Sequence, residues 1–256
     1  MQSYTFKIQE LKFISKFALV FSEIHIKRMN QFEIIKFSVF GLNLQEPMAL
    51  ITNWMISVCC LFAYLNIKWS NSYPSISFKK FYIFLGLSTF LSGFGHIFFQ
   101  YFGFYGKYPA WILAVVTGIF ISQGILFYWR NEKSYNFLSL FLITKSLTLI
   151  CLSLVTQKFV FVAVDSIITY LLYCGFIAGK LWSKNINEMK YFVYGITVLL
   201  PSAFIFLMNI NLHKYLNRDD LSHLLMIACI SFFYVGIKKI NLISLLEEGQ
   251  REVKNS

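Results

Sequence analysis

Residues 81–103 read FYIFLGLSTFLSGFGHIFFQYFG, a stretch without Lys, Arg, Asp or Glu. It exceeds the roughly 18 apolar residues at which a segment is interpreted as a membrane span. Because a lipid-embedded backbone must satisfy its own hydrogen bonds, such spans are helical. Similar runs recur, so the sequence predicts an all-α polytopic membrane protein, a bundle of seven transmembrane helices at roughly 47–67, 81–103, 109–129, 135–156, 159–179, 190–211 and 221–239.

The composition supports a membrane protein. Of 256 residues, 57% are hydrophobic and 14% charged, whereas soluble domains are nearer half apolar and about a quarter charged. This excludes a disordered chain, a secreted disulfide scaffold and an ordinary cytosolic enzyme. The net charge of +11 is spread between the apolar runs, which predicts contact with membrane lipids and no nucleic acid. The cysteines lie inside apolar runs and behave as small hydrophobic residues.

Three regions are expected along the chain. Residues 1–45 carry charges every few positions and suggest an amphipathic or poorly ordered segment; alternatively, translation starts at Met29, so the status of residues 1–28 is open. Residues 46–240 form the transmembrane domain, and residues 241–256 a cytoplasmic polar tail. Lys and Arg near the span ends are commoner on the side of the C-terminus, which places the C-terminus in the cytoplasm and the N-terminus outside, in the periplasm or lumen.

Ionisable side chains inside spans are costly and therefore informative. With this topology, six of the seven lie towards the outer face and one near the middle of the membrane. The outer six are Glu46, His96, Asp165, Asp219, Asp220 and His223, and the one near mid-membrane is Lys145. Their shared depth predicts a functional site.

Spacing within the helices suggests a metal. Ser92 and His96 are four residues apart, as are Asp219 and His223, and such pairs share a helix face. Two histidines and a carboxylate with an open position form a normal catalytic zinc site. Asp219 or Asp220 could be the carboxylate ligand. Glu46 and Asn53, seven residues apart, could supply hydrogen bonds to the metal ligands.

Structural roles remain open for the same residues. One of Asp219 and Asp220 could cap the last helix, and the two histidines could form interhelical hydrogen bonds. Ser92 with its neighbouring glycines could allow close helix packing. Asp165 could be a structural partner of Lys145.

At these residues the chain resembles the superfamily of seven-span membrane hydrolases that contains the alkaline ceramidases and the progestin/adipoQ receptors, often called CREST. The first span has Glu46 followed six and seven residues later by Thr52 and Asn53, as in the ceramidases. The second span carries Ser92-x-x-x-His96, and the last opens with Asp219-x-x-x-His223. The resemblance covers about residues 46–240.

Two departures accompany the resemblance. Family members generally have His-x-x-x-His in the last span, where this chain has Asp219 at the first position. The ceramidases also have an Asp just after the Ser-x-x-x-His span, where this chain has Lys107, Tyr108 and Pro109. Any acidic base must then come from Asp165 or from the free member of the Asp219/Asp220 pair.

The expected function is a zinc-dependent hydrolase of an amide or ester bond in a lipid that enters laterally between spans. Zinc on His96, His223 and Asp219 would activate water, Ser92 would stabilise the oxyanion, and Asp165 or Asp220 would move the proton. The resemblance implies a ceramide-like substrate.

Two alternative functions are a receptor or accessory protein for lipids or small molecules, and a bis-His haem protein. The oligomeric state is open.

Overall fold

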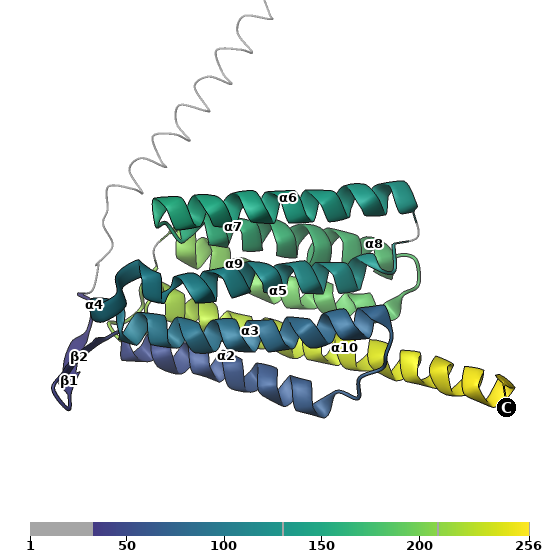
Figure 1. The fold of residues 1–256 in the computed structure, drawn as a ribbon, viewed down its shortest axis with the longest axis horizontal. Coiled ribbons are helices and arrows are strands. Elements are labelled where there is room, and N and C mark those ends of the chain that lie inside the picture. Colours follow the sequence, from purple (N-terminus) through teal and green to yellow (C-terminus); the bar gives the residue numbers. More distant parts are fainter. Residues whose placement is uncertain (1–32, 130, 209, 256) are drawn as a thin grey trace, which may run out of the picture.

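A computed structural model describes residues 33–129, 131–208 and 210–255, and these residues form a helical bundle entered through a small β-hairpin (Figure 1). The expectation for residues 1–32 lies outside the described residues. The bundle confirms an all-α fold suited to a membrane. Its elements are β1 (Lys36–Val39), β2 (Leu42–Gln45), α2 (Pro47–Asn66), α3 (Tyr73–Ile97), α4 (Phe99–Phe102), η1 (Gly103–Gly106), α5 (Tyr108–Leu126), α6 (Glu132–Thr156), α7 (Val160–Thr169), η2 (Tyr170–Ile177), α8 (Ala178–Trp182), η3 (Asn187–Met189), α9 (Lys190–Leu207) and α10 (Arg218–Asn255).

Six helical stretches in the described ranges are long and apolar enough to cross a membrane: Pro47–Asn66, Phe99–Leu126, Glu132–Thr156, Val160–Trp182, Asn187–Phe206 and Arg218–Leu246. Helix α3 is long enough, at 25 residues, but its polar first half makes it less apolar. It begins at Tyr73 instead of 81, because Pro74 suits a first helical turn. Lys79 and Lys80 near its start lie over the rings of Tyr64 and Phe120.

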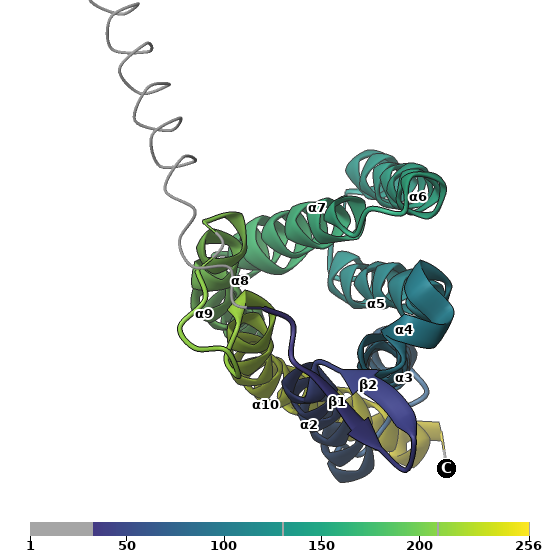
Figure 2. The ribbon, with the colours of Figure 1, turned by 90° about the vertical axis from the view of Figure 1, so that its left-hand side faces the viewer.

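Viewed along their axes, the helices are arranged around a ring, and α6 lies at its edge against α5 and α7 (Figure 2). Helix α3 packs between α2 and α5, and α10 packs against α9 and α2. Aromatic side chains fill the core, where Phe192 contacts both Phe78 and Phe233. Gly195 allows the close approach of α9 to α10, since a Cβ there would lie 2.7 Å from the Phe233 ring. This packing fixes α2, α3 and α10 beside one another, and the site depends on these three helices.

The structure differs from the sequence prediction at both ends of the bundle. Residues 36–45 of the expected amphipathic or poorly ordered segment form the antiparallel pair β1–β2, because apolar and polar side chains alternate there at the period of a strand. At the other end, α10 continues to Asn255 and carries the expected polar tail as helix. No Pro interrupts it, and the last turns project beyond the bundle (Figure 1).

Candidate functional site

Glu46 stands at the junction between the hairpin and α2. Its backbone adopts a left-handed conformation with φ 52°, which is uncommon outside glycine. The Glu46 N–H donates to the carbonyl of Ile35 at 3.0 Å, and Pro47 starts the helix. The sharp turn directs the Glu46 side chain towards α3.

The Glu46 carboxylate holds the imidazole of His96. Glu46 Oε2 lies 2.9 Å from His96 Nδ1, and Lys107 Nζ lies 3.3 Å from the same nitrogen. Burial raises the pKa of Glu46, but the hydrogen bond from His96 and the charges of His96 and Lys107 outweigh it and hold this pKa below its ordinary value. Because an ionised carboxylate only accepts hydrogen bonds, His96 Nδ1–H is the donor. In the neutral imidazole, Nε2 is then the basic nitrogen.

A second group joins α2 to α10. Thr52 Oγ1 lies 2.8 Å from His223 Nδ1 and 3.1 Å from Asp220 Oδ1, and Thr52 and Asp220 are almost fully buried. The hydroxyl carries one proton, so it can donate to Asp220 while accepting from His223 Nδ1–H. Both site histidines are thus held through Nδ1.

Asn217 and Asp220 cap the start of α10 reciprocally. The Asn217 side chain accepts from the N–H groups of Asp219 and Asp220, at 2.8 and 3.0 Å. Asp220 Oδ2 in return accepts from the Asn217 N–H at 3.2 Å, the pattern of a capping box. The N-cap is therefore Asn217 and neither aspartate, whereas Asp220 completes the cap from the first turn and contacts Thr52 through its other oxygen.

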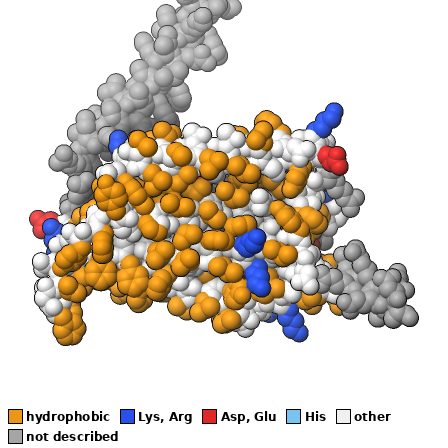
Figure 3. Space-filling model, in the orientation of Figure 1, with side chains coloured by type: hydrophobic (Ala, Val, Ile, Leu, Met, Phe, Trp, Pro, Cys, Tyr) orange, Lys and Arg blue, Asp and Glu red, His pale blue; other side chains and the backbone are white. Residues whose placement is uncertain are grey.

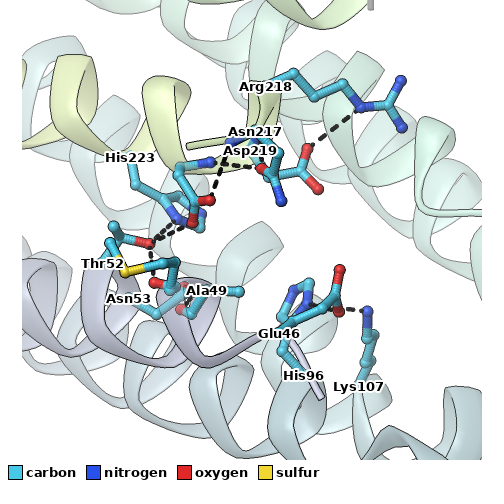
Figure 4. A network of polar contacts seen from close by, with 12 residues as sticks. Glu46, Ala49, Thr52, Asn53, His96, Lys107, Asn217, Arg218, Asp219 and His223 are labelled. Atoms are coloured by element: carbon cyan, nitrogen blue, oxygen red, sulfur yellow. Dashed lines mark hydrogen bonds and ion pairs between the residues drawn. The ribbon is translucent and has the colours of Figure 1, made fainter. Parts of the chain in front are cut away.

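The two groups lie at the same end of the bundle and face a common space (Figure 4). His96 is close enough to Asp220 and His223 to interact electrostatically with both. A pocket of about 340 Å³ beside them is lined by Glu46, Asn217, Asp219 and Asp220 among others.

An apolar groove of about 770 Å³ lies on the flank of the bundle, at the end that carries the hairpin. Leu91, Phe94 and Phe98 line it together with Gly95 and Gly106, which directly precede His96 and Lys107. Glu46 thus lines the polar pocket, and the residue before His96 lines the apolar groove.

Residues 48–242 match the sequence model of DUF6962, a family of unknown function. The chain belongs to the DUF6962 family. The match runs from the first turn of α2 into α10 and includes His96, Lys107, Asp220 and His223. No curated protein and no solved structure matches this chain.

In this DUF6962 protein the expected zinc ligands do not converge. Asp219 lines the polar pocket, but its Oδ1 pairs with Arg218 Nε at 3.5 Å. Asp220 is held by Thr52 and Asn217. Across residues 33–129, 131–208 and 210–255, no group of three or more His, Cys, Asp or Glu side chains could hold a metal ion. The arrangement therefore does not fit the three-ligand zinc site that the sequence predicts.

Two other residues predicted for the site, Asn53 and Ser92, do not contact its histidines or carboxylates. Asn53 Nδ2 donates to the Ala49 carbonyl of its own helix at 2.7 Å. Ser92 is partly buried one turn before His96, and its hydroxyl makes no hydrogen bond within the described part of the chain. Thr52 and Lys107 contact the histidines instead. Thr52 could have been recognised from its position six residues after Glu46, whereas Lys107 had no sequence signal beyond its charge.

Asp165 lies in a separate buried group between α6 and α7. Its Oδ1 forms an ion pair with Lys145 and accepts from Ser146 Oγ at 2.8 Å, while Lys145 Nζ also donates to Thr169 Oγ1 at 2.6 Å. No hydrogen bond or ion pair among the described residues connects this group with His96 or His223. The geometry favours the structural role of Asp165 over the catalytic one.

Proposed function

We propose that this chain is an integral membrane hydrolase that cleaves an amide or ester bond of a membrane lipid. The observation that carries the proposal is that the Glu46–His96 pair has a polar pocket at Glu46 and an apolar groove at Gly95, the residue before His96. An amphiphile needs both surfaces, because its headgroup must stay hydrated or hydrogen-bonded while its chains stay in an apolar environment. The flank position of the groove supports lateral entry of the lipid.

In the proposed topology α3 also crosses the membrane, which raises the number of spans from six to seven, and the end carrying Glu46 faces outward. Support comes from lysines at the opposite end of the bundle, where Lys79, Lys80, Lys238 and Lys239 lie close to aromatic rings. Lys and Arg are enriched on the cytoplasmic side, whereas aromatic rings mark either membrane surface. The C-terminus would then be cytoplasmic.

The proposed chemistry uses side chains that the structure brings together. Glu46 holds Nδ1–H of His96, so Nε2 can take a proton from water as that water attacks the carbonyl carbon. The Lys107 ammonium, beside the same imidazole, would stabilise the negative charge on the carbonyl oxygen. When the tetrahedral intermediate collapses, His96 would return the proton to the departing amine or alcohol.

A lipid panel with matched variants tests this function. The full-length protein is purified, reconstituted in liposomes with amide- and ester-linked lipids, and assayed for released fatty acid. A general base typically contributes about 10²–10⁴-fold, so His96→Ala should lose at least about 100-fold in rate. His213→Ala, which alters an exposed histidine, should retain the parent rate. Equal rates for both variants, or an inert parent protein, would contradict the proposal.

A non-enzymatic lipid receptor is the second candidate. It is favoured because the described side chains include no group that could hold a catalytic metal. A parent protein that binds lipid at saturable stoichiometry but releases no product, with or without added zinc, selects this candidate. The absorption spectrum of the same preparation tests the bis-His haem alternative, which requires a Soret band.

A further inference from the structure

The β1–β2 hairpin has one apolar and one polar face. Phe37 pairs with Leu44 and Val39 with Leu42 in the antiparallel register, while Lys36 pairs with Gln45 and Ser38 with Asn43. Directly paired side chains lie on the same side of a two-stranded sheet, and successive pairs alternate between sides. The apolar pairs therefore share one face and the polar pairs share the other.

The apolar face is buried only at its base. Leu44 is packed against the bundle at 8% exposure, but Val39 and Leu42 further out are 39% and 46% exposed, and Phe40 at the tip is 100% exposed. Phe40 and Gly41 form the two-residue turn with φ 49° and 77°. Such turns favour Asn, Asp or Gly at both positions, so a fully exposed Phe there serves neither the turn nor the packing of the described residues.

The hairpin is anchored beside the mouth of the apolar groove. The Asn43 N–H donates to Tyr101 Oη of α4 at 2.9 Å, and Leu42 lines the groove together with Phe102. Hydrophobic side chains continue from the flank of the bundle onto the hairpin, at the lower left of Figure 3. The exposed tip thus extends the exposed apolar surface of the bundle.

We propose that the tip of this hairpin, residues 39–42, inserts into the outer leaflet of the membrane that the bundle spans. The occupant that fits is lipid, because the apolar tip continues a lipid-facing surface and the opposite face offers Lys36 and Ser38 to headgroups. Amphipathic segments at this level bury their apolar face about 5–10 Å into the headgroup and acyl boundary. The insertion is independent of the proposed hydrolysis.

Fluorescence at the hairpin tests the insertion. The two cysteines that are not buried, Cys59 and Cys151, are replaced by Ala, and Phe40→Cys or Ser38→Cys is introduced and labelled with the polarity-sensitive dye NBD. The labelled full-length protein is reconstituted in phosphatidylcholine liposomes. The Phe40→Cys label should emit at shorter wavelength than the Ser38→Cys label, and nitroxide lipids should quench it at least about twofold more, as expected for a group at the acyl boundary.

Leu42→Cys provides a second position, on the same face as the tip, should Phe40→Cys fail to fold. An aqueous emission wavelength at both apolar positions, with quenching by iodide and not by nitroxide lipids, would overturn the proposal. A second result would also overturn the proposal: blue-shifted emission that lipid nitroxides do not quench, with a shift that disappears when the protein is diluted in lipid. The tip would then contact a second copy of this chain.

Discussion

His96 Nδ1 lies 2.9 Å from Glu46 Oε2, and this contact connects the last turn of α3 to the residue before α2. The two residues are 50 positions apart in the chain. The pair orients the imidazole and also closes one end of the bundle, so its loss should affect both activity and stability.

Glu46→Gln tests the charge of this pair. A hydrogen bond to a charged group contributes about 1.5–3 kcal/mol, and the neutral amide should lose much of that. The pKa of Glu46 is lowered in the folded protein, so its contribution is complete above the ordinary pKa of about 4.3 and decreases as the pH falls through the folded-state value. Thermal unfolding in detergent between pH 7 and pH 3.5 should show a smaller acid loss for Glu46→Gln than for the parent protein. Parallel pH profiles for the two proteins would contradict the assignment.

Thr52→Val tests the contact between α2 and α10. Valine has the shape of threonine without the hydroxyl, so His223 Nδ1 and Asp220 Oδ1 each lose a partner. A buried polar group left unpaired costs about 1–3 kcal/mol, measurable as a lower midpoint of denaturant unfolding. Thr197→Val is the matched control, because Thr197 is exposed and bonds only the Val193 carbonyl of its own helix. Equal midpoints for the two variants would show that the Thr52 contact does not stabilise the fold.

Lys145 and Asp165 should behave as a structural pair. Removing one member of a buried ion pair costs about 3–5 kcal/mol, so Lys145→Met and Asp165→Asn should each destabilise strongly. The double variant should recover part of that loss, because it leaves no unpaired charge. Lipid hydrolysis per folded molecule should be retained in the double variant. A loss of turnover without a loss of stability in Asp165→Asn would instead make Asp165 catalytic.

Gly95→Ala tests the close contact behind His96. A Cβ at Gly95 would lie 2.8 Å from the Gly106 carbonyl oxygen, and backbone there cannot move without shifting Lys107. Overpacking of this kind typically costs about 1–3 kcal/mol, and we expect lower stability together with weaker lipid binding. Gly179→Ala meets its nearest neighbour only at 3.8 Å and should match the parent protein in both measurements.

The common location of Glu46, His96, Asp220 and His223 could be predicted because ionisable groups are rare in the spans, and depth alone places them at one end. Their individual partners could not be predicted. Spacing shows which residues share a helix face, but the rotation of α10 against α2 depends on packing over the whole interface. That rotation brings Asp220 to Thr52 and leaves Asp219 with Arg218.

Asp165 shows the limit of an argument from depth. Its depth predicts a position near the outer face with the other acids, but α7 packs against α6, and the partner of Asp165 is Lys145. Depth gives no information about neighbours around the bundle. The hairpin was missed because each strand has only four residues, too few for alternation to be distinguished from a polar segment.

Helix α10 has 38 residues, about 57 Å at 1.5 Å per residue, nearly twice the apolar thickness of about 30 Å. Its first turns carry Asp220 and His223, and its last turns project past the opposite end of the bundle. One continuous helix therefore has one end at the candidate site and the other beyond the opposite end of the bundle. If α10 tilts as one straight helix, a small tilt at the candidate site produces a larger sideways displacement at its C-terminal end.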